Sequence, residues 1–363
     1  MSKVQRYYDI SKILSKDANI NIIYGEKSNG KSYQVKHELA IKHYLNTGKR
    51  FILMRRWNAD ITNLWIEQYF KDVNVKELTS GKYEFITTYR KVLYFGNYNE
   101  KKKGTVSKDE VIGYVIALST EQHMSSASFL DVDTIIFEEF FERGAYIKDE
   151  ASRLMIFYNT IDRKRGTTKL YCVGNTISKV TPYLKDWDLM KIVKNLKQGE
   201  IETVVVHNEE NDVKIAIEYC RSSGGKTMAI GSAKSMIDKG SWQSRPQPHL
   251  PKSKNMYNIL FRIGFLYQGF KFLGEFLQDK EDTTNCCWFI FPFENGTFKN
   301  DLIIFSDEVS TSPYYQKDIY KLTFKNDRIQ NLLYNTFRES MIFYSDDLTG
   351  TDFKSAIDFM IRK

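Results

Sequence analysis

Features typical of secreted, zinc-binding or membrane-spanning proteins are scarce in this sequence. The four cysteines form no Cys-x-x-Cys pair and the five histidines show no ligand spacing, so we do not expect a zinc site. No apolar run approaches the ~20 residues that cross a bilayer, and the first residues lack the apolar core of a signal peptide. We therefore expect a cytoplasmic protein without a membrane partner, whose cysteines are structural thiols.

The sequence does contain enough apolar material for two domains, and it has an excess of positive charge. Its 363 residues are 42% hydrophobic and 14% aromatic, which favours a folded protein with real cores. The formal net charge is +8, and residues 221–254 contain seven basic residues and one acidic residue. Six of the eight net charges therefore lie in one short stretch, which indicates either a polyanionic partner or a solvated linker.

The strongest motif follows a short apolar run and reads Gly25-x-x-x-x-Gly30-Lys31-Ser32. A helical pattern over residues 33–45 comes next, which completes the strand–loop–helix context of a phosphate-binding loop. The glycines let successive N–H groups point inward at an anion, and the helix N-terminus adds its dipole. Lys31 is predicted to reach the β- and γ-phosphates of ATP, and the Ser32 hydroxyl to ligate Mg²⁺. A glycine-rich turn without a ligand is the alternative. The predicted nucleotide contacts in this loop are Gly25, Glu26, Lys27, Ser28, Asn29, Gly30, Lys31 and Ser32.

A second motif is the apolar strand pattern from Val132 to Phe140, which contains the paired acids Glu138 and Glu139 near its end. At a strand end beside a phosphate loop, the first acid can hold the Mg²⁺ shell and the second can orient the attacking water. An aspartate usually stands first. The extra methylene of Glu138 shifts its carboxylate, so we expect a water-mediated metal contact. The alternative is a strand that merely exits into a charged loop.

Further polar residues fall next to predicted strands. Arg55 ends one strand pattern and Asn175 follows another, so both are predicted to face the nucleotide, Asn175 as a sensor of the γ-phosphate. Surface ion pairing and turn capping are their respective alternatives. Arg163 and Arg165 precede the strand at 169–173 and are predicted to stabilise γ-phosphate charge, in the same subunit or in a neighbour's site. A solvated basic loop is the competing interpretation.

The order of patterns predicts an α/β domain over residues 1–220, a basic linker over 221–254 and an α+β domain over 255–363. The elements predicted for the first domain are strands at 20–25, 50–55, 84–86, 92–95, 111–118, 133–137 and 169–173, helices at 61–73 and 150–162, and a charged loop at 97–110. Those predicted for the last domain are strands at 257–267, 270–276, 286–293 and 302–305, and helices at 326–338 and 352–362.

These motifs, in this order and spacing, resemble the DNA-packaging (encapsidation) ATPases of small phi29-like podophages. The resemblance covers residues 10–185 and is loose afterwards. It implies a terminase-like P-loop NTPase of the ASCE class that uses ATP and Mg²⁺. It further implies a homo-oligomeric ring, pentameric in the family, that pumps double-stranded DNA into a prohead through the portal in the host cytoplasm. The residues that carry the resemblance are Gly25–Ser32, Arg55-Arg56, Thr134–Phe140, Arg163-x-Arg165 and Gly174-Asn175-Thr176.

The resemblance also implies roles for single residues. Glu138 matches the metal-side acid, Glu139 the catalytic glutamate and Arg163 the arginine finger that acts across a subunit interface, with Arg165 beside it. Two departures stand out. Glu138 replaces an aspartate, and residues 121–128 contain no lysine at a place where the family can use one in trans.

For the C-terminal domain the resemblance implies an RNase H-like nuclease fold that has lost its metal site. The sequence agrees, because the predicted strands at 257–267 and 286–293 carry no carboxylate that could hold two metals. An RNA scaffold between ATPase and portal is used by some members of the family. Two other classes remain open: a P-loop small-molecule kinase, and a nucleic-acid-binding assembly module with a vestigial nucleotide site.

Overall fold

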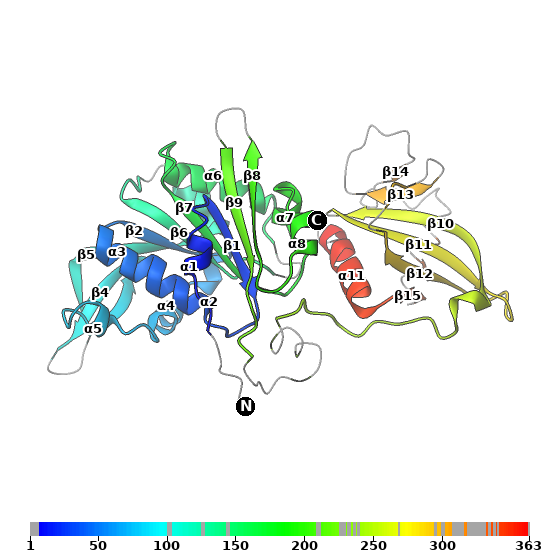
Figure 1. Cartoon of the computed structure of the whole chain (residues 1–363), viewed down its shortest axis with the longest axis horizontal. Helices are drawn as coiled ribbons and strands as arrows, with labels where there is room; N and C mark the ends of the chain where they lie inside the picture. Colours follow the sequence, from blue (N-terminus) through cyan, green and yellow to red (C-terminus); the bar gives the residue numbers. More distant parts are fainter. Residues whose placement is uncertain are drawn as a thin grey trace. The chain divides into compact units, whose positions relative to one another are not determined.

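The structure is a computed structural model (Figure 1). It describes residues 7–99, 104–124, 128–142, 146–207, 212–224, 230, 234, 237, 240–267, 269–293, 296–298, 302–306, 316–317, 332, 335–336, 339 and 341–361. The chain forms two compact units. The first consists of Met1–Ile177, Asp186–Ala229 and Lys234–Ser241, and the second of Ser178–Lys185, Ile230–Ala233 and Trp242–Lys363.

The first unit is built on a large mixed sheet. Its strands in the described residues are β1 (Ile20–Gly25), β2 (Arg50–Arg55), β3 (Phe85–Tyr89), β4 (Val92–Tyr98), β5 (Gly104–Ala117), β6 (Val132–Glu138), β7 (Lys169–Asn175), β8 (Ile201–His207) and β9 (Asp212–Tyr219). They lie in the order β3-β4-β5-β2-β6-β7-β1-β9-β8. The strands from β5 to β9 in this order pair in parallel, whereas β3, β4 and β8 pair antiparallel at the two edges.

The central strands are buried on both faces. Every residue of β1 is buried, and in β6 all residues except Asp133 are buried. Near-continuous apolar runs of this kind are typical of parallel strands covered by helices on both sides. The sequence pattern therefore placed these strands correctly, and their common direction brings their carboxyl ends to one edge of the sheet.

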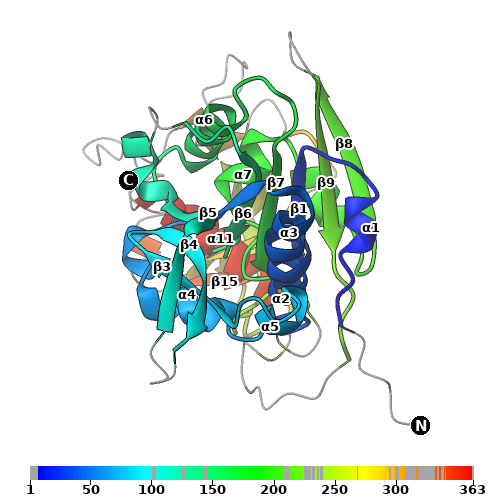
Figure 2. The ribbon, with the colours of Figure 1, turned by 90° about the vertical axis from the view of Figure 1, so that its left-hand side faces the viewer.

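Helices cover the sheet (Figure 2). One helical run begins within the phosphate loop motif, at Lys31. Val35 and Leu39 from the helical run that follows the loop pack in one core with Ile66 and Phe70. The α- and π-helices among the described residues of the first unit are α1 (Ser11–Leu14), α2 (Lys31–Gln34), a π-helical stretch (Val35–Lys42), α3 (His43–Thr47), α4 (Asn63–Phe70), α5 (Val75–Leu78), α6 (Glu150–Asp162) and α8 (Met190–Asn195). Most of α7 (Pro182–Asp186) belongs to the second unit.

Most predicted elements of the first unit are confirmed, and the errors fall on a predicted loop and on one hairpin. The predicted loop at 97–110 is wrong for residues 97–98, which belong to β4, and for residues 104–110, which belong to β5 and of which 104–106 pair with β4. Residues 100–103 lie outside the described part of the chain. The 104–110 part of β5 is polar, so hydrogen bonding in the ladder and not an apolar pattern places it. β8 differs, because it contains the apolar run 204–206 although all of its residues are partly or fully exposed. The hairpin of β8 and β9 was not predicted.

The second unit contains a smaller sheet and a terminal helix. Its described elements are β10 (Tyr257–Tyr267), β11 (Phe270–Asp279), β12 (Cys286–Pro292), β13 (Ile303–Ser306), β14 (Gln316–Lys317), β15 (Ile342–Tyr344) and α11 (Asp347–Ile361). The strand order is β14-β13-β10-β11-β12-β15. β10, β11 and β12 pair antiparallel, while β13 pairs in parallel with β10 and β14 with β13. This is the strand arrangement of the predicted RNase H-like fold.

The four strands predicted here and the terminal helix are found at nearly the predicted positions. The helix predicted at 326–338 lies largely outside the described residues. No helix in the described part of the chain combines the length and the apolar character that crossing a bilayer requires.

The second half of the predicted linker packs with the second unit. The Arg245 N–H donates to the Thr351 hydroxyl at 2.9 Å, and the Lys252 ammonium binds Asp279 at 2.7 Å. Lys254 lies 2.6 Å from a carboxylate oxygen of the buried Glu275. Two of the seven basic residues in the 221–254 stretch are thus neutralised by acids of their own unit, which leaves fewer cations there for a polyanion.

One buried acid ties the N-terminal segment to the sheet. Glu218 on β9 is buried and accepts a hydrogen bond from the Tyr8 hydroxyl at 2.7 Å. Burial raises the pKa of this carboxyl from 4.5 to about 7. The charged form is therefore disfavoured in the folded protein, and stability falls as the pH rises from about 4.5 to about 7.

Replacing Glu218 by glutamine should remove this loss of folding stability at rising pH. We expect Glu218→Gln to be about 1–3 kcal/mol more stable than the native protein at pH 8 and to show a flatter stability profile between pH 5 and 8. Chemical denaturation at several pH values measures both. Glu202→Gln, an exposed acid on the adjacent strand β8, is the matched control and should leave the profile unchanged. A native-like pH slope in Glu218→Gln would contradict the assignment.

Candidate active site

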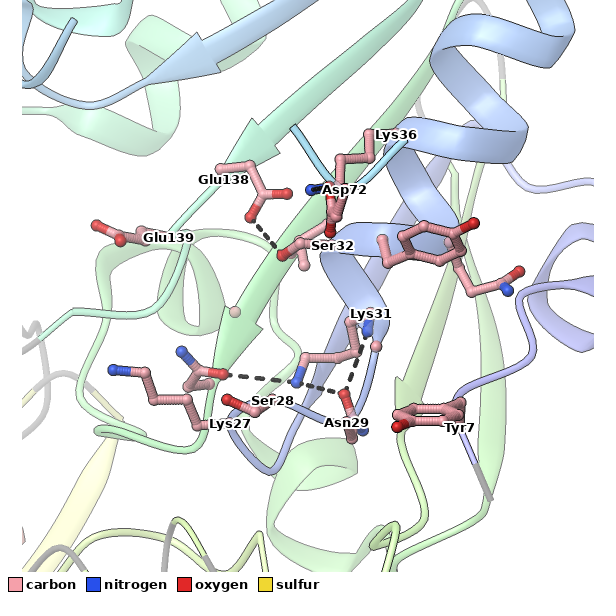
Figure 3. Close-up of a pocket in the computed structure, with 16 residues that line it drawn as sticks. Tyr7, Lys27, Ser28, Asn29, Lys31, Ser32, Lys36, Asp72, Glu138 and Glu139 are labelled. Carbon is pink, nitrogen blue, oxygen red and sulfur yellow. Dashed lines mark hydrogen bonds and ion pairs between the residues drawn. The ribbon is translucent and has the colours of Figure 1, made fainter. Parts of the chain in front are cut away.

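A cavity of about 720 Å³ opens at the carboxyl edge of the first sheet, where β1, β6 and β7 end. Parallel α/β sheets bind their ligands at this edge. The cavity brings together the phosphate loop, Glu138 at the end of β6 and Glu139 just after it (Figure 3). Asn175 at the end of β7 also lines it. Its predicted lining residues are Lys27, Ser28, Asn29, Gly30, Lys31, Ser32, Glu138, Glu139 and Asn175.

The loop backbone requires its glycines for two different reasons. Gly30 has a φ of 94° at the N-cap of α2, a conformation that side chains rarely adopt. At Gly25 the reason is space, because a Cβ there would lie 3.1 Å from the Cβ of Cys220. The short turn from β1 into α2 thus depends on both positions that define the motif.

The Lys31 ammonium is buried and bound to its own loop. It donates to the Glu26 carbonyl and, at 3.1 Å, to the Asn29 side-chain oxygen; the Asn175 side-chain oxygen lies 3.5 Å away. Burial lowers the pKa of Lys31, and the nearby acids oppose this shift. The cation is therefore held inside the loop, at the place where an anion enclosed by the loop would meet it.

Glu26 does not line the cavity, although the sequence analysis predicted a nucleotide contact for it. Its carboxylate is buried and accepts hydrogen bonds from the hydroxyls of Ser222 and Ser223, just after β9. Gly240 is packed so closely that a Cβ there would lie 2.8 Å from the Glu26 nitrogen. Glu26 and Gly25 thus fix the loop to the strand ends around it.

Glu138 and Ser32 form the pair that a metal would use. The Ser32 hydroxyl donates to one Glu138 carboxylate oxygen at 3.1 Å, and the Tyr69 hydroxyl donates to the other at 2.6 Å. Burial raises the pKa of Glu138, and these two hydrogen bonds oppose the rise. A hydroxyl and a carboxylate side by side suit Mg²⁺, which prefers oxygen ligands.

The rest of the donor set fits Mg²⁺ as well. The described residues contain no cluster of three or more His, Cys, Asp or Glu side chains that could hold a metal. Mg²⁺ commonly binds one or two protein groups and takes its other ligands from water and phosphates, so the pair Ser32 and Glu138 is sufficient for it.

Glu139 is turned away from Ser32 (Figure 3). Its backbone has a φ of 58°, and its carboxylate pairs with the Arg55 guanidinium at 2.6 Å. Arg55 also lies 3.6 Å from Asp60 and 4.9 Å from the centre of the Trp65 ring. Arg55, for which a contact with the nucleotide is predicted, does not line the cavity. It binds the predicted catalytic acid instead.

The neighbouring arginine fixes the turn that carries both acids. Arg56 donates from Nε to both Glu150 carboxylate oxygens at 2.9 Å, and from its other nitrogens to the carbonyls of Glu139 and Phe140. Both charged partners are buried. Removing one partner of a buried ion pair is strongly destabilising, so this pair holds the turn after β6 in place.

Arg163 and Arg165 lie at the opposite edge of the sheet from the cavity. They precede β7, and the Arg165 guanidinium donates to the carbonyls of Leu130 and Val132, where β6 begins. It also binds the carbonyls of Ile161 and Asp162. Arg165 is thus engaged in holding this loop, whereas Arg163 ends α6 and is exposed. Neither arginine lines the cavity of its own chain.

Several residues near the cavity were missed by the sequence analysis. Tyr7, Lys36 and Asp72 line it, and Tyr69 reaches it through Glu138. No sequence motif marks them. Lys36 lies in the π-helical stretch after the phosphate loop, and such segments often occur at functional sites. Its contact with Asp72 depends on the packing of α4, which no local pattern reveals.

The chain resembles known proteins in both sequence and fold. Residues 1–215 match the model of a family described as podovirus DNA encapsidation protein (Gp16). The DNA packaging protein of Bacillus phage phi29 is 28% identical over 187 residues, which are 51% of each chain. That of Bacillus phage B103 is 29% identical over 176 residues, 47% of this chain and 48% of the relative. The chain thus matches about half the length of these curated relatives.

The likeness in fold extends over both units. A solved structure of the bacteriophage phi29 viral genome packaging motor assembly aligns with 98% of this chain and 99% of its own, with a TM-score of 0.55 and 17% identity. At that identity the alignment shows the fold alone. The family match covers more than half of the residues, and it shows that the chain belongs to the podovirus DNA encapsidation protein (Gp16) family.

Proposed function

We propose that this chain is the ATP-hydrolysing subunit of a ring-shaped motor that moves double-stranded viral DNA into a prohead through the portal. One observation carries the proposal. In a member of a DNA encapsidation family, Lys31, Ser32, Glu138 and Glu139 converge on a single cavity at the carboxyl edge of a parallel sheet. These are the residue types that phosphoryl transfer from ATP to water requires.

Binding would begin at the loop. The backbone N–H groups from Lys27 to Ser32 surround the phosphates, and the Lys31 ammonium exchanges the Glu26 carbonyl and Asn29 for the β- and γ-phosphates. Mg²⁺, held by Ser32 and by Glu138 directly or through water, would neutralise charge on these phosphates. Asn175, 3.5 Å from the Lys31 ammonium, is placed to contact the γ-phosphate.

Hydrolysis needs a base for the attacking water, and Glu139 is the exposed acid of the pair. While Arg55 binds its carboxylate, Glu139 faces away from Ser32. Glu139 must therefore leave Arg55 and turn toward the γ-phosphate before it can accept the proton. In this account the site binds ATP first and assembles its base afterwards.

The position of Arg163 supports a ring. This exposed residue lies at the opposite edge of the sheet from its own cavity, and we propose that it serves the cavity of a neighbouring subunit. A closed ring, pentameric as in the family, provides such a neighbour for every subunit. We assign the finger to Arg163 and a structural role to Arg165, whose guanidinium already binds four carbonyls.

The remaining parts of the chain fit the same function. We propose an ATPase domain over 1–220, a connecting segment over 221–254 that attracts DNA phosphates, and an RNase H-like domain over 255–363 without nuclease activity. In the last domain the buried Glu275 is bound by Arg262 at 2.9 Å and by Lys254 at 2.6 Å, which occupies this acid with side-chain cations. The portal, viral DNA and an RNA scaffold are the proposed partners, and the host cytoplasm is the place of action.

The two glutamates should give different phenotypes. Glu139→Gln should bind ATP but lose nearly all hydrolysis, with and without duplex DNA, because an amide cannot accept the proton. Glu138→Gln should instead require more Mg²⁺ for nucleotide binding. ATP hydrolysis and Mg²⁺-dependent nucleotide binding separate them, and Glu142→Gln, further along the same turn, is the control. If each variant showed the phenotype expected of the other, Glu138 would be the catalytic base and Glu139 the metal-side acid.

The finger should act between subunits. Arg163→Ala should lower hydrolysis by about 10³–10⁵-fold while ATP affinity changes little. Mixing Arg163→Ala subunits with Lys31→Ala subunits should restore part of the activity, since some interfaces then combine an intact loop with an intact arginine. Lys164→Ala, in the same exposed loop, is the matched control and should retain activity. Absence of rescue at every mixing ratio would contradict an arginine supplied in trans.

A further inference from the structure

We propose that Tyr69 is a positioning residue for the metal-side acid Glu138, an inference that rests on the proposed function. Tyr69 lies in α4, 69 positions before Glu138 in the sequence, and its hydroxyl donates to a Glu138 carboxylate oxygen at 2.6 Å. Tyr69 belongs to no motif of the sequence, and it does not line the cavity itself. Its influence on the site passes through Glu138.

The need for such a residue follows from the glutamate. A glutamate side chain has one more rotatable bond than the aspartate usual at this place, so its carboxylate is less constrained by the strand end. In this structure each carboxylate oxygen has one donor: Tyr69 at 2.6 Å and Ser32 at 3.1 Å. Two donors on opposite oxygens fix the plane of the carboxylate and keep one oxygen next to the serine hydroxyl.

Tyr69 is itself held in place from the phosphate-loop side. The Lys36 ammonium lies 4.8 Å from the centre of the Tyr69 ring, donates to the Tyr69 carbonyl and pairs with Asp72. Lys36 is buried and stands five positions after Lys31 on the same helical run. On the other side, the Trp65 ring lies 5.4 Å from the Tyr69 ring. The hydroxyl therefore projects toward Glu138 from a braced ring.

This arrangement separates two tasks of the Glu138 carboxylate. The oxygen next to Ser32 faces the cavity and is the one available to a metal or its bound water. The other oxygen stays with Tyr69 whether or not the first is in use. Partners that orient a metal-binding side chain in this way typically contribute about 10–100-fold to metal affinity.

Tyr69→Phe tests the inference, because it removes the hydroxyl and leaves the ring. Binding of a fluorescent, non-hydrolysable ATP analogue is measured while Mg²⁺ is titrated, and again in EDTA. We expect the variant to need about 10–100-fold more Mg²⁺ for half-maximal Mg²⁺-dependent binding, with unchanged affinity in EDTA. Tyr158→Phe is the matched control, since its hydroxyl donates to the Thr168 carbonyl at 2.7 Å in the same unit, near the start of β7.

A double-mutant cycle with Glu138→Asp makes the test specific. The shorter side chain withdraws the carboxylate from the Tyr69 hydroxyl, so adding Tyr69→Phe to Glu138→Asp should cause no further loss of Mg²⁺ affinity. A loss caused by general damage to the fold would instead appear in both backgrounds.

Three outcomes of these experiments would overturn the inference. It fails if Tyr69→Phe binds Mg²⁺ and analogue like the native protein, if Tyr158→Phe shows an equal loss, or if the Tyr69→Phe loss persists in Glu138→Asp. In these three cases the native protein still binds the nucleotide with Mg²⁺, and the proposed function stands. If the native protein binds no nucleotide with Mg²⁺, the proposed function fails first and the inference with it.

Discussion

The parallel hydrogen-bond register between β1, β7 and β6 determines where the chemistry of this chain takes place. Gly25, the last residue of β1, pairs with Asn175, and Glu138, the last residue of β6, pairs with Val173. Three strands from distant parts of the sequence therefore end within two residues of one another. The phosphate loop, the acid pair and Asn175 meet there because each directly follows or ends a strand. A shift by one residue in either pairing would turn these side chains to the other face of the sheet.

Around this edge, the charged groups needed for the reaction are bound to partners that a nucleotide can replace. The Lys31 ammonium binds the Glu26 carbonyl and Asn29, the Glu139 carboxylate binds Arg55, and one oxygen of Glu138 binds Ser32. A buried charge without a partner is costly, so these contacts stabilise the site when no ligand is present. ATP with Mg²⁺ brings both negative and positive charge. The phosphates can replace the present partners of Lys31, and Mg²⁺ can come between Ser32 and Glu138. Nucleotide binding in this account is an exchange of hydrogen-bond and ion-pair partners.

How much of this could be predicted from the sequence depends on the distance between interacting residues. Lys31 and Ser32 belong to the phosphate-loop motif, and Glu138 and Glu139 stand at the end of an apolar strand pattern. Patterns of neighbouring residues were therefore sufficient to predict where these four residues lie. Arg55 was predicted to face the nucleotide because it ends β2, yet it pairs with Glu139, 84 positions away. The partners of Glu138 and Lys36, which are Tyr69 on α4 and Asp72 just after that helix, are also distant in the sequence. The packing of α4 on the sheet brings them close. Residues 104–110 extend a strand through backbone pairing alone, which leaves no apolar pattern to recognise.

The central claim is that ATP turnover in this cavity moves DNA. The most direct measurement is the amount of DNA protected from added nuclease inside proheads, with ATP supplied and either the native chain or Lys31→Ala as the packaging subunit. The account predicts length-dependent protection that requires ATP with the native chain, and none with Lys31→Ala assembled to the same extent on the prohead. Equal protection with Lys31→Ala, or protection by the native chain without ATP, would contradict it.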